Sequence, residues 1–162
     1  GLESQSLFNK NWEYKTTLYY QNGNKKMERE ESKHPDDKWL TIIDYKNYWD
    51  NGKLSEEGRR IKGISSWGDG SYEGDIKFYA KTGELTDVQK YKKGKPHGLW
   101  TLTPVDGLFY SEQIYNDEGK LAQDSIFEKE TKKLMKKIEY YSDGSTKSEF
   151  EDPTYKEKIK AS

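Results

Sequence analysis

The stretch NYWDNGKL, Asn47–Leu54, places two aromatic residues directly before an Asn-Gly pair. Asn-Gly and Asp-Gly pairs supply the positive backbone φ angles that a two-residue β-hairpin turn requires. Tyrosine and tryptophan before the turn favour a pleated, half-buried surface. With Asn51-Gly52 as the turn, Trp49 faces Leu54 across the hairpin. The stretch therefore predicts a β-hairpin.

Four further stretches repeat this pattern. They are LYYQNGNK at Leu18–Lys25, FYAKTGEL at Phe78–Leu85, IYNDEGKL at Ile114–Leu121 and YYSDGSTK at Tyr140–Lys147. The turn glycines of the five copies are Gly23, Gly52, Gly83, Gly119 and Gly144. They are 29, 31, 36 and 25 residues apart, and a tyrosine lies four residues before each one. Self-similarity at such a period is typical of a repeat architecture, so the five glycines are predicted to lie at successive hairpin turns.

The composition limits how large a core these hairpins can form. Leu, Ile, Val and Phe account for 27 of the 162 residues, too few for a compact two-layer sandwich. The 28 basic and 29 acidic residues leave a net charge of −1, so the chain lacks the high net charge of a disordered protein. Tyrosine and tryptophan add side chains that bury large areas while a polar tip stays in water. We therefore predict a single all-β domain over residues 1–162, an elongated, twisted antiparallel sheet of successive β-hairpins.

Polarity patterns beside the turn motif indicate further strands and loops. In DIKFYAKTG, Ile76 and Phe78 alternate with more polar residues, as expected for an antiparallel strand with one solvated side. The charged segment Met27–Asp37 is predicted to be a loop, and the glycine-rich segment Gly63–Gly74 a long connecting loop. The polar tail, residues 151–162, is predicted to be frayed.

Three features of the chain bear on its compartment. No apolar run approaches the length of about 18 residues that a membrane span requires. Cysteine is absent, which excludes disulfides, thiolate metal sites and cysteine nucleophiles. The sequence begins at Gly1 without methionine or a signal peptide. A mature exported protein and a trimmed chain with Gly1 left from cloning both fit this start, and we favour the periplasm or cell surface over the cytoplasm.

The blocks Tyr48–Gly58, YWDNGKLSEEG, and Tyr91–Trp100, YKKGKPHGLW, resemble the bacterial variant of the MORN repeat. Those repeats read roughly Tyr-Tyr-x-Asn-Gly-x-Leu, a short strand, and then Tyr-x-x-Gly-x-x-x-Gly-x-Trp. The similarity covers about Tyr48–Leu121 and is degenerate at Tyr19–Glu30 and Tyr140–Phe150. Proteins built from such repeats are often labelled antitoxin components of the YwqK type. The resemblance implies an elongated sheet of hairpins and an antitoxin- or immunity-like protein, and it carries over no catalytic residue.

Candidates for catalysis or metal binding are few. His97, in GKPHGLW, has the chemistry of a base or metal ligand, but its place between glycines favours a turn residue at a variable position of the repeat. Adjacent carboxylates such as Asp36-Asp37 do not follow the spacing of a calcium loop. The basic run Lys129–Lys137 is flanked by acidic residues, so we predict a solvated hairpin arm and no nucleic-acid contact. We predict no enzyme activity, no metal and no cofactor.

Aromatic residues are the remaining candidates for function. Tyrosine and tryptophan are enriched at binding hot spots, and a one-layer sheet cannot cover both of its faces. We therefore predict an exposed aromatic stripe that binds a partner, centred on Tyr48, Trp49, Tyr79 and Trp100. The preferred function is a non-catalytic protein-binding module whose partner is a toxin or an envelope component. The alternative is a cell-envelope module that stacks glycans on Trp49, Trp67 and Trp100.

Overall fold

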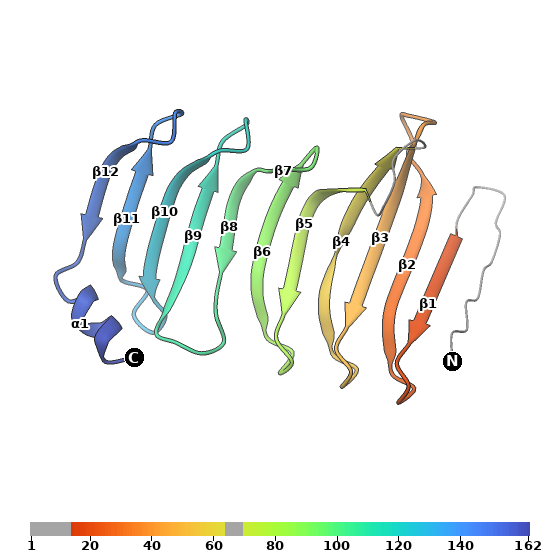
Figure 1. Ribbon diagram of the computed structural model, residues 1–162, viewed down its shortest axis with the longest axis horizontal. Coiled ribbons are helices and arrows are strands. Elements are labelled where there is room, and N and C mark those ends of the chain that lie inside the picture. Colours follow the sequence, from red (N-terminus) through yellow and green to blue (C-terminus); the bar gives the residue numbers. More distant parts are fainter. Residues whose placement is uncertain (1–13, 64–69) are drawn as a thin grey trace.

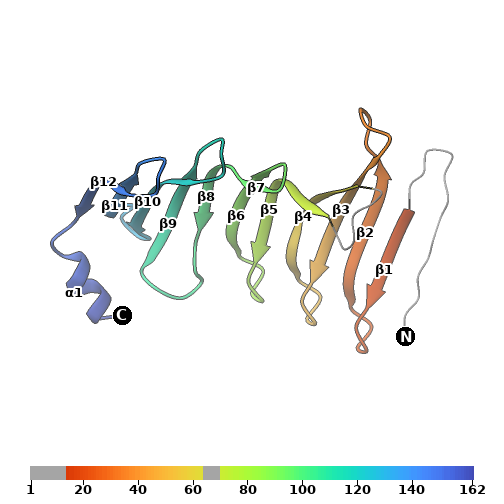
Figure 2. The same ribbon diagram turned by 45° about the horizontal axis from the view of Figure 1, so that its top comes forward.

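The computed structural model describes residues 14–63 and 70–162, and most of them belong to one antiparallel sheet. The strands are β1 (Tyr14–Tyr19), β2 (Lys25–Lys33), β3 (Leu40–Tyr48), β4 (Leu54–Gly63), β5 (Ser71–Tyr79), β6 (Leu85–Lys92), β7 (Lys95–Pro96), β8 (Gly98–Leu102), β9 (Phe109–Tyr115), β10 (Leu121–Glu128), β11 (Leu134–Tyr140) and β12 (Thr146–Glu151). These twelve strands of the described chain follow one another across the sheet, with β7 paired only to β6. The result is a long, twisted ribbon with two open edges (Figure 1, Figure 2). The predicted fold, an elongated antiparallel sheet of hairpins, is confirmed.

All five repeat glycines lie in hairpin turns with the same backbone hydrogen bonds. In one of them, the N–H of Gly52 donates to Trp49 O at 2.9 Å and the N–H of Trp49 donates to Lys53 O at 2.7 Å. The φ angles of the five glycines lie between 82° and 97°, and the residues before them do not have positive φ. This is a three-residue loop, a type I turn closed by a glycine bulge. The predicted two-residue turn is therefore wrong, and Tyr48 rather than Trp49 pairs with Leu54.

A second irregularity recurs in every repeat. The register of each hairpin skips one residue on its second strand, three positions after the turn glycine. The skipped residues are Lys26, Ser55, Thr86, Ala122 and Lys147. A bulge of this kind bends its strand and increases the local right-handed twist. One bulge in each repeat therefore contributes twist at regular intervals along the ribbon (Figure 2).

The five hairpins do not all have their turns at the same end of the strands. Successive turns of an antiparallel meander alternate between the two ends of the strands. Gly23, Gly52 and Gly83 connect β1–β2, β3–β4 and β5–β6, so their turns lie at one end, the lower end in Figure 1. Strand β8 adds one strand before the next repeat, so the turns of Gly119 and Gly144 lie at the upper end. The longest spacing in the series, 36 residues, marks this insertion.

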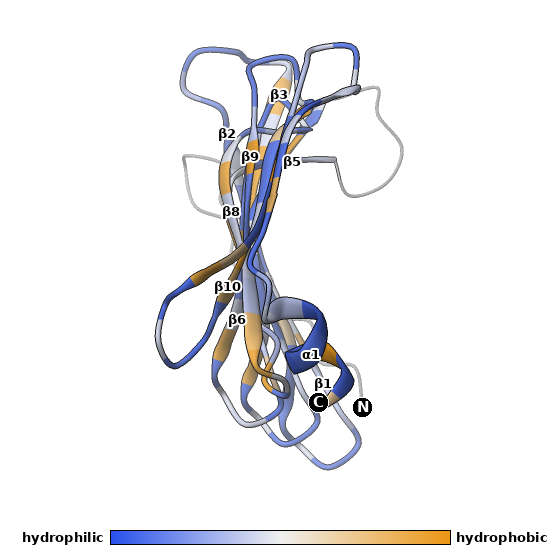
Figure 3. Cartoon of the chain, turned by 90° about the vertical axis from the view of Figure 1, so that its left-hand side faces the viewer, coloured by the Kyte–Doolittle hydropathy of each residue, from blue (hydrophilic) through white to orange (hydrophobic). Residues whose placement is uncertain are grey.

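The sheet is one layer thick, and it buries few side chains completely. Among the described residues, the buried hydrophobic side chains are Ile43, Tyr45, Ile76 and Met135. Seen along its long axis, the chain is a thin twisted layer in which apolar segments alternate with polar ones (Figure 3). This thin core agrees with the low content of aliphatic residues.

Strand β2 occupies most of Met27–Asp37, the segment predicted to be a loop, so that prediction is wrong. The prediction rested on the many charged residues of the segment and on Pro35 near its end. A strand in a one-layer sheet has solvent near both faces, so it can carry charged side chains on either side. Ion pairs along β2 support this arrangement: Arg29 lies 2.7 Å from Glu31, and Lys25 lies 2.5 Å from Glu28.

The predicted loop Gly63–Gly74 is shorter than expected at both ends. Strand β4 ends at Gly63 and β5 begins at Ser71, so Ser71–Gly74 is strand. Residues 64–69, with Trp67 among them, lie outside the described part of the chain.

The polar tail contains a short helix. Residues Tyr155–Lys160 form helix α1. The carboxylate of Asp152 lies 2.6 Å from the Lys133 ammonium, which holds the pKa of Asp152 well below its usual range. The ring of Tyr155 meets that of Phe109 edge-on, with 5.3 Å between the centroids. These contacts hold the start of the helix against β9 and the turn before β11, which the charge pattern of the tail alone does not predict.

Candidate binding surface

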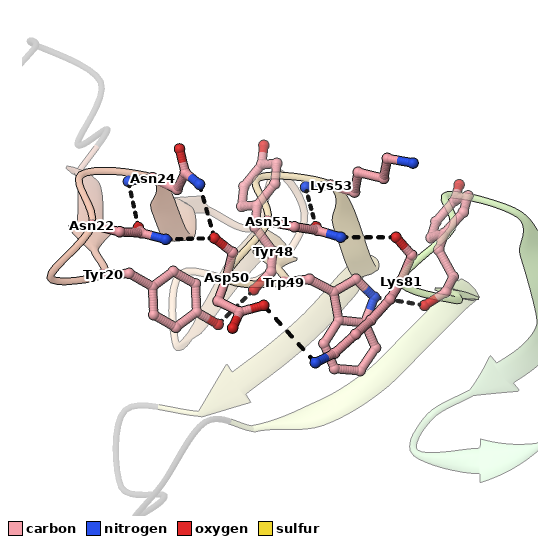
Figure 4. Close-up of polar contacts among 10 residues, drawn as sticks. Tyr20, Asn22, Asn24, Tyr48, Trp49, Asp50, Asn51, Lys53 and Lys81 are labelled. Atoms are coloured by element: carbon pink, nitrogen blue, oxygen red, sulfur yellow. Dashed lines mark hydrogen bonds and ion pairs between the residues drawn. The ribbon is translucent and has the colours of Figure 1, made fainter.

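The first three turns are connected by side chains that reach from one repeat to the next (Figure 4). The hydroxyl of Tyr20 donates to Tyr48 O at 2.7 Å. One repeat further, the indole N–H of Trp49 donates to Tyr79 O at 3.0 Å. Tyr20 and Trp49 hold the same position, three residues before a turn glycine. The sequence repeat therefore places an equivalent hydrogen bond between successive hairpins.

A second set of bonds runs parallel to the first. The side-chain amide of Asn22 donates to Asp50 O at 2.8 Å, and that of Asn51 donates to Lys81 O at 2.9 Å. Both asparagines directly precede a turn glycine. We call the four bonds from Tyr20, Trp49, Asn22 and Asn51 the turn ladder. It stacks the turns of β1–β2, β3–β4 and β5–β6 on one another.

Tyr48 and Tyr79, two of the predicted binding residues, point to the same face of the sheet. The hydroxyl of Tyr48 donates to Glu28 Oε2, and that of Tyr79 donates to Glu57 Oε1 at 2.7 Å. Partial burial and, next, the hydrogen bond to the carboxylate raise the pKa of Tyr48 and of Tyr79 to about 12. The hydrogen bond from Lys25, followed by that from Tyr48, lowers the pKa of Glu28. Each ring therefore holds a carboxylate in place.

Glu28 and Glu57 belong to a row of charges that crosses four strands. Glu28 lies opposite Lys46, Lys46 opposite Glu57, and Glu57 opposite Lys77. Residues directly opposite one another in a sheet share a face and have Cβ atoms about 4.5–5.5 Å apart. We call Glu28, Lys46, Glu57 and Lys77 the charged row, and the side of the sheet that carries them the charged face. The sign of the charge alternates from each strand to the next.

A shallow groove of about 590 Å³ lies over the charged face from β1 to β5. Arg59 Nε donates to Asp44 Oδ1 at 2.7 Å beside the charged row, and Lys15 lies 3.4 Å from Glu30. The charged lining residues are Lys15, Glu28, Arg29, Glu30, Asp44, Lys46, Glu57, Asp75 and Lys77. Small-molecule pockets are mostly apolar with a few polar groups. A groove lined by charges of both signs is better suited to the surface of a macromolecule.

Trp100 lies on the opposite face. Its neighbour Thr101 is in register with the charged row, and adjacent residues of a strand point to opposite faces. The ring of Trp100 packs between Tyr91 and Tyr115, with centroids 5.1 Å and 4.7 Å away. Its indole N–H donates to Lys90 O at 2.8 Å. The four aromatic residues predicted to bind a partner therefore do not form one surface.

The row of rings around Trp100 continues over neighbouring strands. Tyr72 lies 4.9 Å from Tyr91, and the guanidinium of Arg60 lies over Tyr72 and Tyr45 at 4.6 Å and 5.1 Å from the ring centroids. We call the side of the sheet that carries these rings the ring face. Each of these rings packs against its neighbour across the sheet, as expected for cross-strand aromatic pairs. The flat sides of the rings are therefore largely covered by contacts within the sheet.

Exposed aromatic residues are scattered and do not form the predicted stripe. Among the described residues they are Tyr14, Tyr19, Trp39, Tyr141 and Phe150. They come from both edge strands, from one turn and from the β2–β3 connection. The expectation failed because cross-strand ring contacts and hydrogen bonds occupy the aromatics of the central repeats.

The remaining chemical candidates are surface groups. The backbone N–H of His97 donates to Lys90 O at 2.9 Å, and its Nδ1 lies 3.6 Å from the exposed carboxylate of Asp117. Across residues 14–63 and 70–162, no group of three or more His, Cys, Asp or Glu is arranged to hold a metal ion. No helix in the same residues has the length and hydropathy needed to cross a membrane.

The charged row was not anticipated from the sequence, although the sequence contains a signal for it. Glu28 and Glu57 each lie five residues after a turn glycine, and Lys46 and Lys77 each lie six residues before one. A search for charges at fixed offsets from the glycines would have found all four. The assumed two-residue turn already sets Lys46 opposite Glu57, because the bulge after the turn restores that register. The pairing between hairpins, of Glu28 with Lys46 and of Glu57 with Lys77, depends on the register of the β2–β3 and β4–β5 connections, which the turn motif does not specify.

Comparison of the sequence with protein-family models and with curated proteins finds no match. Family membership therefore stays a prediction from the resemblance.

Proposed function

We propose that this protein is a non-catalytic binding protein whose charged face recognises another protein. The charged row is the observation that carries this proposal, because it presents both signs of charge in a fixed order over β2–β5. Alternating charges discriminate between partners and steer their encounter more than they add affinity. Such a surface is suited to selecting one complementary protein.

Two features of the charged row support binding over a purely structural role. The hydroxyls of Tyr48 and Tyr79 fix the carboxylates of Glu28 and Glu57 before a partner arrives. Groups that are already ordered lose less conformational entropy on binding. The lysines Lys46 and Lys77 line the groove beside them and complete the pattern. The surface is therefore preorganised and open.

The finer form of the proposal follows the resemblance to MORN-like repeat proteins. In that form the partner is a toxin or an envelope component, and the sheet acts as an antitoxin- or immunity-like cover. A ribbon of successive hairpins offers a long face on which a partner can lie across several strands (Figure 1).

The glycan alternative has less support. Sugar stacking needs a free ring face, whereas Trp100 is enclosed between two tyrosine rings. Trp49 is half-buried, and the Lys81 ammonium lies over its ring at 5.5 Å from the centroid. Trp67 is outside the described residues. The observations favour the charged face over these rings.

Site-specific photo-crosslinking in the native cells tests the proposal. A photoreactive residue is placed at Lys46 or Lys77 on the charged face, at Gln89 on the ring face, and at Lys137 in β11. Lys137 is the best control because it continues the same row across β9 and β10. We expect one protein to be crosslinked from positions 46 and 77 and not from 89 or 137.

The crosslinked protein is then purified and titrated calorimetrically against the wild type and Lys46→Glu. A loss of affinity in the variant, with an unchanged melting temperature, supports recognition by the charged face. Crosslinks from position 89 alone, or retention on envelope polysaccharide that Trp49→Ala abolishes, would reject it.

A further inference from the structure

The order of charges in the charged row has a symmetry property. Read from β2 to β5 the signs are minus, plus, minus, plus, and read from β5 to β2 they are plus, minus, plus, minus. The row is therefore complementary to its own reversed copy. A row with an odd number of charges, or with one sign only, lacks this property.

A two-fold axis reverses the row in the required way. If the axis runs along the strands and passes between β3 and β4, Lys46 of one copy meets Glu57 of the second copy, and Glu28 meets Lys77. Each pair then occurs twice, as in every isologous contact. A neighbouring row across the same strands consists of Glu30, Asp44, Arg59 and Glu73. In the same arrangement, Asp44 of one copy meets Arg59 of the second, whereas Glu30 meets Glu73, which has the same charge. The centre of the contact, on β3 and β4, is therefore its most complementary part.

The twist of the sheet is compatible with this contact. A rotation by 180° about an axis along the strands carries a twisted sheet onto a sheet of the same twist facing it. Two such sheets can stay at a constant separation, about 10 Å for face-to-face packing. Long lysine and glutamate side chains are able to span that space. The shape of the ribbon therefore does not oppose face-to-face pairing.

We propose that the charged face is the contact between two copies of this chain, paired face to face about that axis. This inference rests on the proposed function, because it names a second copy as the partner of the same face. The contact is held by ion pairs between solvated groups and is weakened by salt. The dimer is in equilibrium with the monomer, so the face is also available to another protein.

Sedimentation equilibrium of the full chain, over a range of concentration and of salt, tests the inference. We expect a monomer–dimer equilibrium whose dissociation constant rises at least about tenfold between about 0.02 M and 0.5 M sodium chloride. Lys46→Glu sets two acidic groups against each other, and Glu57→Lys sets two basic groups against each other. Each single variant is expected to weaken the dimer roughly tenfold or more.

The double variant Lys46→Glu/Glu57→Lys is the decisive one. Its row reads minus, minus, plus, plus, which is again complementary to its reversed copy, so the dimer is expected to return to near wild-type strength. A different protein that binds the charged face keeps its own charges and would not be recovered by the double swap. The rescue therefore separates self-association from binding to another protein.

Lys137→Glu in β11 is the matched control and is expected to leave the dimer unchanged. Melting temperatures are measured for every variant. If the charge-reversal variants Lys46→Glu and Glu57→Lys unfold, the neutral variants Lys46→Gln and Glu57→Gln are measured in their place. A wild type that stays monomeric at low salt, or a double variant as weak as the single ones, overturns the inference. If crosslinking at position 46 still captures a different protein, the proposed function stands and only the identity of the partner changes.

Discussion

The region of strands β1–β6 and the region of strands β8–β12 contain the same type of hairpin, but the turns lie at opposite ends of the strands. The three turns of the first region lie at one end of the strands, directly beside one another. The two turns of the second region lie at the opposite end, because β8 adds one strand between the regions. The difference shows that an identical local turn acquires a different environment when a single strand is inserted.

The two regions are also held together by different interactions. The turn ladder joins the repeats of the first region through side chains that donate to backbone carbonyls. In the second region Met135 is fully buried, the rings of Tyr110 and Phe127 stack with centroids 5.1 Å apart, and Tyr155 of α1 packs edge-on against Phe109. The first region also carries the charged face. Buried hydrophobic side chains occur in both regions, Ile43, Tyr45 and Ile76 in the first and Met135 in the second.

The largest expected effect separates the stability of the two regions. Ile76, with 0% of its surface exposed, lies in the first region, and Met135, also 0% exposed, lies in the second. Ile76→Ala and Met135→Ala are each expected to lower the free energy of unfolding by about 2–4 kcal/mol, from lost burial and the cavity left behind. In a one-layer sheet each strand contacts only its neighbours, so the loss should concentrate in the mutated region. Hydrogen exchange by mass spectrometry is the measurement.

We expect Ile76→Ala to raise exchange in β3–β6 and to leave β10–β12 near the wild type, and Met135→Ala to do the reverse. Equal loss of protection throughout the sheet, for both variants, would show that the chain unfolds as one unit.

Turn glycines should be equally sensitive in the two regions. Gly52 in the first region and Gly144 in the second have φ of 83° and 88°. Alanine in this left-handed conformation costs about 1–2 kcal/mol, and neither position meets a neighbour closer than 3.6 Å to an added Cβ. Urea unfolding of Gly52→Ala and Gly144→Ala should therefore show similar losses. A loss at one position alone would contradict the common turn geometry.

The turn ladder predicts a smaller effect that differs between the regions. Tyr20 and Tyr141 both lie three residues before a turn glycine, but Tyr20 donates to Tyr48 O at 2.7 Å whereas Tyr141 is 53% exposed. Tyr20→Phe should cost about 0.5–1.5 kcal/mol, the usual net value of one hydrogen bond. Tyr141→Phe should be neutral within about 0.3 kcal/mol, as an exposed substitution is. Thermal unfolding of both variants measures the two losses of stability. Equal losses would show that the Tyr20 hydrogen bond of the turn ladder does not stabilise the fold.

Alkaline pH tests the contact between Tyr79 and Glu57. Burial and the hydrogen bond to Glu57 raise the pKa of Tyr79 to about 12, whereas a tyrosine in the unfolded chain titrates near about 10. Between these values the unfolded state has lost the proton and the folded state keeps it, so stability falls as the pH rises. The wild type should lose stability between about pH 10 and pH 12 more steeply than Tyr79→Phe. Identical slopes in denaturant titrations across that range would show that Tyr79 does not titrate differently on folding.

Much of the fold follows from the sequence. The recurring glycines, the tyrosines before them and the scarcity of aliphatic residues predict an elongated sheet of hairpins. The charged strand β2 and helix α1 are missed for physical reasons. A one-layer sheet accepts charge on both faces, and α1 depends on contacts with Lys133 and Phe109, which are remote in the sequence.

The candidate site is less predictable than the fold. Aromatic residues are expected at binding surfaces, but whether a ring is free depends on its neighbours across the sheet. Tyr48 and Tyr79 bind carboxylates, and Trp100 is enclosed by other rings. The charged row depends on the register between hairpins, across the β2–β3 and β4–β5 connections, and the turn motif does not specify that register.

The most direct test of binding by the charged face compares two lysines of one row, Lys46 in the first region and Lys137 in the second. The dissociation constant is measured for the complex captured at position 46, whether its partner is a second copy or another protein. Lys46→Glu is expected to raise it at least about tenfold, and Lys137→Glu less than about twofold, with similar melting temperatures. Equal effects of the two variants, or a larger effect of Lys137→Glu, would contradict the assignment of binding to the charged face.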